Sequence, residues 1–135
     1  MNQIEKTGAN KPTYFFDTYA FFEILRGNPS YSQYTNVRII TTIFNIAELN
    51  YNLKKEKNKE TADAITDKYK QYIVPLIIDD IKKAMDIKIK QKHLSIPDAI
   101  GYIVAKRHNV KFLTGDDDFK SFDNVEFVKW KFGIL

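Results

Sequence analysis

The chain has 135 residues, a length that accommodates one domain and leaves no room for two. It contains no cysteine and only two histidines, His93 and His108. Disulfides, thiolate metal sites and cysteine nucleophiles are therefore excluded, and a multi-histidine zinc site is disfavoured. With 44% hydrophobic residues, 28% charged residues and a net charge of +4, the composition is that of a folded domain with one core.

The first eleven residues are polar, and no apolar run approaches the roughly 18 residues that a membrane-spanning helix needs. We therefore expect a cytoplasmic protein without membrane contact. We also expect residues 1–12 to form a flexible arm and residues 13–135 to form a single domain.

Short apolar runs alternate with helical patterns along the chain. In chain order, they predict a strand at 14–16, a helix at 18–25, a helical turn at 31–34, a strand at 37–40, a helix from 42 into the charged stretch 54–59, a helix at 61–72, at best an edge strand at 73–78, a helix from 79 or 80, a helix at 95–108, and strands at 110–113 and 125–128. The alternation favours an α/β three-layer sandwich with a central, mostly parallel sheet of four to five short strands flanked by helices. In such sheets ligands bind beyond the carboxyl ends of the strands.

Two aspartates stand at predicted helix starts. Asp17 follows the apolar run 14–16 directly and can cap the helix after it. Asp98 ends Ser95-Ile96-Pro97-Asp98, a capping-box pattern with proline in the first turn, where it is tolerated. Capping alone would explain either residue, but an aspartate that leaves a central strand also lies at the mouth of the sheet.

Glu48 lies one and a half turns into the helix that begins near Thr42. With Asn45 and Asn52 it forms a polar stripe, and a stripe of this kind is typical of a solvent face. Because it lies near the start of the helix, Glu48 can also face the pocket above the sheet.

The segment Leu113–Phe119 runs from a predicted strand through Thr114 and Gly115 into three consecutive aspartates. One carboxylate is enough to cap a short helix. Two carboxylates about 4 Å apart repel each other by roughly 4 kcal/mol at an effective dielectric constant of 20. Three acids at a strand end therefore indicate either a bound cation or free exposure to water.

Asp17, Asp98 and Asp116 all stand at helix starts, and a parallel sheet places such starts on one edge. We therefore expect these aspartates to converge on one pocket, with Glu48 reaching it from another direction. Oxygen ligands without sulfur or imidazole favour Mg²⁺ or Mn²⁺.

These motifs resemble the PIN-domain family and, within it, the VapC-type toxin ribonucleases of toxin–antitoxin systems. The matching segments are FFDTYAFFEIL around Asp17, NIAELNYNL around Glu48, IPDAIGYIVAKRHNVKFLTGDDDF from Ile96 to Phe119, and the closing strand. The resemblance spans about residues 13–131, and the order and spacing of the acids agree with it. It implies a PIN-like nuclease domain and a metal-dependent endoribonuclease that hydrolyses RNA phosphodiester bonds as the toxin of a type II toxin–antitoxin system.

The resemblance also implies roles for individual residues. It makes Asp17, Glu48, Asp98 and Asp116 the catalytic acids, gives Asp17, Asp98, Asp116 and Asp118 to the metal, and leaves Thr18 and Thr114 to support the site by hydrogen bonds. Asp117 falls on a variable position and is expected at the surface. Tyr19 is a departure, because a small polar residue often follows the Asp-Thr pair in similar toxins. The implied partners are an RNA substrate, a cognate antitoxin and a second copy of the chain.

If six of the 17 acidic residues gather at the site, the rest of the surface carries about +10, which suits a polyanion. Candidate RNA contacts are Lys54, Lys55, Lys106 and Arg107, for which solvated helix ends are the alternative. Both histidines are expected at the surface or at helix ends. The aromatic string from Tyr14 to Phe22 is expected in the core or in a dimer interface.

Two other functions stay open from the sequence. One is a catalytically silent interaction module that keeps the fold and uses the pocket for a regulatory cation. The other is a flap-type DNA nuclease, which shares the acidic residues. A phosphotransfer enzyme is disfavoured, because Asp17-Thr18-Tyr19 lacks the second aspartate that such enzymes place two residues after the first.

Overall fold

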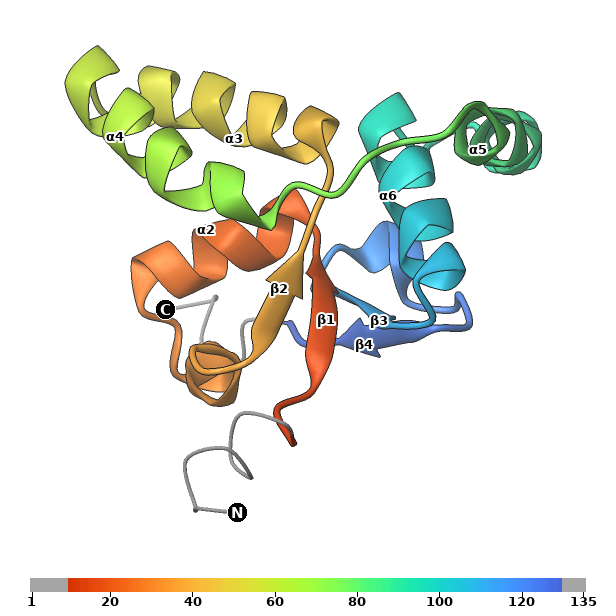
Figure 1. Cartoon of the computed structure of the whole chain (residues 1–135), viewed down its shortest axis with the longest axis horizontal. Helices are drawn as coiled ribbons and strands as arrows, with labels where there is room; N and C mark the ends of the chain where they lie inside the picture. The colour runs from red at the N-terminus through yellow and green to blue at the C-terminus, as the bar shows by residue number, and fades with distance from the viewer. Residues whose placement is uncertain (1–9, 130–135) are drawn as a thin grey trace.

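The computed structural model describes residues 10–129; the first nine residues of the predicted N-terminal arm and residues 130–135 lie outside this range. Within it, four strands form one parallel sheet in the order β2-β1-β3-β4 (Figure 1). The strands are β1 (Thr13–Phe16), β2 (Arg38–Ile40), β3 (Lys111–Thr114) and β4 (Val125–Phe127). The predicted α/β fold with a central parallel sheet is confirmed.

Helices cover both faces of the sheet. One layer contains α2, α3 and α4, and the other contains α5 and α6 (Figure 1). None of the helices in residues 10–129 combines the length and apolarity that crossing a membrane requires. The helices are α2 (Thr18–Arg26), α3 (Ile43–Glu56), α4 (Lys59–Tyr69), α5 (Ile78–Lys90) and α6 (Ile96–Arg107), with short 3₁₀ helices η1 (Pro29–Tyr34), η2 (Lys70–Tyr72) and η3 (Asp117–Phe119).

Strand β1 supplies the core on both faces, because successive side chains of a strand point in opposite directions. Phe16 packs into the cluster beneath α2, α3 and α4, whereas Phe15 packs into the cluster beneath α5 and α6. Phe15 also stacks on Phe112 of β3, with ring centroids 5.3 Å apart. The aromatic string around β1 and α2 is thus part of the core, as one of its two interpretations predicted.

The sequence predicted at best an edge strand at residues 73–78, but the structure has no strand in this segment. Its only sheet-like contact among the described residues is a single bridge between Ile73 and Thr41. The Val74 N–H donates to the Thr41 carbonyl at 2.9 Å, and Pro75, which has no N–H, prevents the ladder from continuing. The segment is therefore a connection between η2 and α5.

Gly101 lets α6 approach β1 closely. A Cβ at this position would lie 3.0 Å from the Phe15 ring and 3.3 Å from the Asn45 side-chain oxygen, which is tighter than ordinary contacts. The absence of a side chain at Gly101 therefore allows the first turn of α6 to lie beside α3, above the carboxyl edge of the sheet.

Candidate active site

Four separate segments bring acidic side chains to the carboxyl edge of the sheet. Asp17 follows β1, Asp116 follows β3 by two residues, Glu48 lies in α3 and Asp98 lies in the first turn of α6. Burial, followed by the negative charges of Asp98 and Glu48, raises the pKa of Asp17 well above its ordinary value. Burial and then the charges of Asp116 and Asp118 raise the pKa of Asp98. The structure thus brings the predicted acids close enough to repel one another.

Asp17 is the buried centre of this group, with 3% of its surface exposed. It caps α2 as predicted, because its Oδ1 accepts a hydrogen bond from the Thr18 N–H at 2.9 Å. Its Oδ2 accepts from the Thr114 hydroxyl at 2.7 Å, and Thr114 Oγ1 accepts from the Asp116 N–H at 3.1 Å. Thr114 therefore links the acids that follow β1 and β3.

Glu48 is half-buried and is held by the first turn of α2. Its Oε1 accepts from the Thr18 hydroxyl at 2.8 Å. The Asn45 amide donates to Thr18 Oγ1 at 3.2 Å and to Asp17 Oδ1 at 3.5 Å, while the Thr42 hydroxyl donates to Asn45 Oδ1 at 2.7 Å. The pKa of Glu48 is raised, because burial and the charge of Asp98 together outweigh the Thr18 hydrogen bond, which lowers it. The polar stripe on α3 thus faces the site and not only solvent.

Thr42 and Asn45 were missed as site residues by the sequence reasoning. Both are fully buried, and both belong to the hydrogen-bond network that holds Asp17 and Glu48. The available signal was their spacing: Thr42 caps α3 by accepting from the Asn45 N–H at 3.3 Å, as an N-cap residue does with the residue at the fourth position. An amide at that fourth position, one turn before Glu48, points back toward the strand end.

Asp98 both caps α6 and faces the other acids. The predicted capping box is present: the Ser95 N–H donates to Asp98 Oδ2 at 3.2 Å and the Asp98 N–H donates to Ser95 Oγ at 3.1 Å. The two interpretations of Asp98 are therefore compatible, since the cap fixes the carboxylate where the charges of the neighbouring acids reach it.

The three consecutive aspartates after β3 occupy different environments. Asp116 Oδ1 accepts from the Asp118 N–H at 3.0 Å and so caps η3. Asp117 is exposed and pairs with Lys129, which agrees with its predicted surface position. Asp118 is half-buried, and its Oδ1 lies 4.0 Å from the Nε2 atom of the exposed His93. Asp116 and Asp118 thus face the site, and Asp117 faces solvent.

The donor set suits a hard divalent cation, because it consists of carboxylate and hydroxyl oxygens without sulfur. In residues 10–129, however, no three His, Asp or Glu side chains are close enough to enclose an ion by themselves. Mg²⁺ keeps several waters and is usually bound by one or two carboxylates together with substrate phosphates, not by an all-protein cage. The open arrangement of mutually repelling carboxylates therefore fits Mg²⁺, or Mn²⁺ in the same role.

Lys54 and Lys55, two predicted RNA contacts, lie exposed in the last turn of α3. Lys54 pairs with Asp63 of α4 at 3.2 Å, and the Lys55 ammonium lies 4.7 Å from the centroid of the Tyr51 ring. Both cations are on the helix that carries Glu48.

Lys106 and Arg107, the other two predicted RNA contacts, lie at the end of α6. They are eight and nine residues after Asp98, which corresponds to about 12–14 Å along a helix axis. Lys106 pairs with Asp123 at 3.3 Å, and Arg107 pairs with the buried Asp80 at 2.8 Å. The structure does not bring these two residues to the acids, and it gives Arg107 a structural role between α6 and α5.

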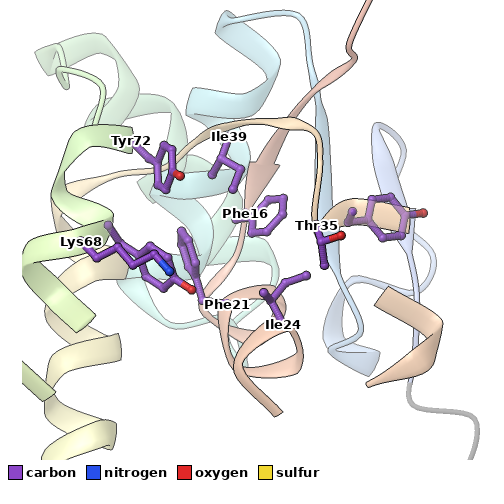
Figure 2. Close-up of a pocket in the computed structure, with 9 residues that line it drawn as sticks. Phe16, Phe21, Ile24, Thr35, Ile39, Lys68 and Tyr72 are labelled. Atoms are coloured by element: carbon purple, nitrogen blue, oxygen red, sulfur yellow. The ribbon is translucent and has the colours of Figure 1, made fainter. Parts of the chain in front are cut away.

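A separate pocket of about 140 Å³ lies between α2, η1, β2 and α4. Figure 2 shows apolar side chains from β1 (Phe16), α2 (Phe21, Ile24) and β2 (Ile39) lining it, with Lys68 and Tyr72 on another side. None of the predicted acids lines this pocket. It is thus an aromatic and aliphatic hollow distinct from the acidic cluster.

The described residues thus form a parallel sheet between two helical layers, with a buried aspartate and further acids at the carboxyl edge of the sheet. The sequence model of one family, described as "PIN domain", matches residues 14–125. The chain therefore belongs to the PIN domain family, whose members are nucleases. No curated protein matches the chain.

Solved structures share the fold at low sequence identity. A toxin–antitoxin complex from Klebsiella pneumoniae contains a chain that is 19% identical with a TM-score of 0.66, over 84% of this chain and 95% of that one. VapBC2 from Rickettsia felis, bound to a DNA fragment from its promoter, gives 22% identity and a TM-score of 0.61 over 87% and 98%. DNA-bound VapBC from Salmonella typhimurium gives 15% identity and a TM-score of 0.67 over 88% and 98%. The fold of the chain is thus VapC-like.

Proposed function

We propose that this chain is a Mg²⁺- or Mn²⁺-dependent endoribonuclease. The observation that carries the proposal is the group of Asp17, Glu48, Asp98 and Asp116 at one sheet edge, where burial and mutual repulsion raise the pKa of three of them. Repulsion of this kind destabilises an empty site and is relieved by a cation. Perturbed carboxylates that gather from distant segments are typical of a functional site rather than of helix capping.

The chain's own residues would hold and orient the reacting groups. Asp17, Asp98, Asp116 and Asp118 would hold the cation, and Glu48, fixed by Thr18, would accept a proton from water. When bound, a divalent cation supplies positive charge against the phosphate and acidifies water. The Thr114 hydrogen bond favours the ionised form of Asp17, because it lowers the pKa of that carboxyl, although the larger effect of burial raises it.

RNA is the proposed substrate because of the charge distribution. The chain has 21 Lys and Arg against 17 Asp and Glu, and several of those acids are at the site. An acidic pocket within a basic surface suits a polyanion whose phosphate is bridged by a metal ion. Binding of RNA is therefore expected to weaken steeply as the salt concentration rises.

Cleavage assays with matched variants test the proposal. The wild type is expected to cut single-stranded RNA with Mg²⁺ or Mn²⁺ and not with EDTA. The Asp116→Asn and Asp17→Asn variants are expected to lose this activity, whereas Asp117→Asn, a change of the neighbouring exposed acid, should keep it. Equal activity of Asp116→Asn and Asp117→Asn would refute the assignment. Cleavage of a DNA flap in preference to RNA would favour a DNA nuclease instead. Metal binding without cleavage of either substrate would favour a catalytically silent module.

We further propose that the chain is the toxin of a type II toxin–antitoxin pair and forms a homodimer. The similarity of its fold to chains of complexes described as toxin–antitoxin and VapBC assemblies supports the toxin role, and the homodimer is what the family resemblance implies. Expression of the wild type in bacteria is expected to arrest growth, and expression of Asp17→Asn is not. Light scattering on the purified chain tests the dimer, which a mass of 15.8 kDa in solution would contradict.

A further inference from the structure

Helix α3 carries two exposed aromatic side chains on the same side as Glu48. Phe44 is 37% exposed and Tyr51 is 63% exposed. They are four residues before and three residues after Glu48, and residues at such spacings are neighbours on one face of a helix. At a rise of 1.5 Å per residue, they lie about 6 Å and 4.5 Å from Glu48 along the axis, in opposite directions.

Their exposure is unusual for this molecule. The sequence has 18 Phe and Tyr residues, and among those in residues 10–129, Phe44 and Tyr51 are the two that are exposed. The other aromatic side chains of that range are buried or half-buried, mostly in the two cores. The packing of the domain therefore does not account for an aromatic ring at either position.

A cation accompanies the row. Lys55, one turn after Tyr51, places its ammonium 4.7 Å from the centroid of the Tyr51 ring. The phosphate of a nucleotide whose base stacks on the Tyr51 ring would lie within reach of this ammonium. Aromatic rings interleaved with Lys or Arg are the arrangement by which proteins bind unpaired nucleotides without strong sequence preference.

We propose that Phe44 and Tyr51 are stacking platforms for two unpaired bases, one on each side of the phosphodiester that is cleaved near Glu48, with Lys55 contacting the phosphate beside Tyr51. The inference rests on the proposed ribonuclease function and names the side chains of this chain that would bind the unpaired nucleotides of its substrate. Bases within a duplex have no free face to offer, so a helical RNA would not engage the row.

Binding measurements in the Asp17→Asn background, which we expect not to cleave RNA, test the inference independently of catalysis. The probe is a fluorescently labelled ten-nucleotide single-stranded RNA, compared with the same strand in a duplex. Tyr51→Leu is expected to weaken binding of the single strand about ten-fold, the order of one base stack, and Tyr51→Phe to keep it within about two-fold. Phe44→Leu should act like Tyr51→Leu, and binding of the duplex should not change.

Ile43→Ala provides the matched control, since Ile43 is 57% exposed on the same helix but lies off the Phe44–Tyr51 row. Its single-strand affinity should equal that of the parent. Equal affinities of Tyr51→Leu and Tyr51→Phe, or no single-strand binding at all, would overturn the inference. A change of oligomeric state in Tyr51→Leu with unchanged RNA binding would overturn it too and would make this face a protein contact. If the wild type cut no RNA but the single strand still bound in a Tyr51-dependent way, the ribonuclease proposal would be refuted and the stacking inference would hold.

Discussion

Replacement of Thr114 by valine removes one hydroxyl from the centre of the site and leaves its shape. In the wild type this hydroxyl donates to Asp17 Oδ2 at 2.7 Å and accepts from the Asp116 N–H at 3.1 Å, and Thr114 is fully buried. A hydrogen bond to a charged group contributes about 2 kcal/mol. Because Asp116 is half-exposed, water can take over its N–H. We therefore expect Thr114→Val to lose about 2 kcal/mol of unfolding free energy at a pH where Asp17 is ionised, which is about 7 °C in Tm for a domain of this size.

The pH dependence of this loss identifies the charged partner. The Thr114 hydrogen bond lowers the pKa of Asp17, so it favours the ionised carboxylate. Its contribution is fully present where Asp17 is ionised in the folded protein and is lost as the pH falls through the raised pKa of Asp17. Thermal unfolding from about pH 8 to about pH 5 should therefore show the wild type and Thr114→Val converging toward acid.

Thr41→Val is the control for this experiment, because Thr41 is equally buried but its hydroxyl donates to the neutral Phe16 carbonyl at 3.0 Å. Its loss should be about 1 kcal/mol and independent of pH. A Thr114→Val loss that equals that of Thr41→Val, or that stays constant over the pH range, would refute the reasoning.

Three further predictions concern the same structure. Asp17→Asn should raise the Tm at pH 7.5 in EDTA while abolishing cleavage, because burial and the charges of Asp98 and Glu48 disfavour an ionised Asp17 in the folded state; a lower Tm would show that Asp17 stabilises the fold instead. Gly115→Ala should cost about 1–3 kcal/mol in denaturant unfolding, since its Cβ would lie 2.4 Å from the Tyr19 ring and from the Val128 carbonyl oxygen; unchanged stability would mean that this turn yields freely. Arg107→Ala should cost about 3–5 kcal/mol at neutral pH by leaving the buried Asp80 unpaired. Burial raises the pKa of Asp80, but the hydrogen bonds from Arg107 and from the Ile77 N–H lower it by more, so the net pKa lies below its ordinary value. The Arg107→Ala loss should therefore shrink at acid pH, whereas Lys106→Ala, which breaks the exposed pair with Asp123, should cost less than about 1 kcal/mol at any pH; equal losses in the two variants would contradict the buried-pair argument.

At the acidic positions, patterns of neighbouring residues were enough to predict much of the local structure. The apolar run before Asp17 and the capping box around Asp98 are patterns of adjacent residues, and both form as predicted. The convergence of these segments was inferred from a general property of parallel sheets. Strands β1 and β3 do pair in parallel, as this inference required.

What the sequence could not provide depends on contacts between distant segments. The burial of Asn45 follows from the packing of α3 against α2, and helical periodicity alone could not choose between a solvent face and a site face. The ion pair of Arg107 with Asp80 joins α6 to α5, so a helix-end position alone suggested a free cation. The single bridge at Ile73 in place of a strand likewise reflects the neighbouring Pro75 and the tertiary path between α4 and α5.

Titration of the wild type with Mn²⁺, followed by calorimetry, asks directly whether carboxylates from four segments act as one ion-binding group. The account predicts measurable binding to the wild type, equal binding to Asp117→Asn, and binding weakened about ten-fold or more in Asp17→Asn and in Asp116→Asn, because a hard cation depends on its carboxylate ligands. Identical Mn²⁺ affinity in Asp17→Asn and the wild type, or no binding to the wild type with or without RNA, would contradict it.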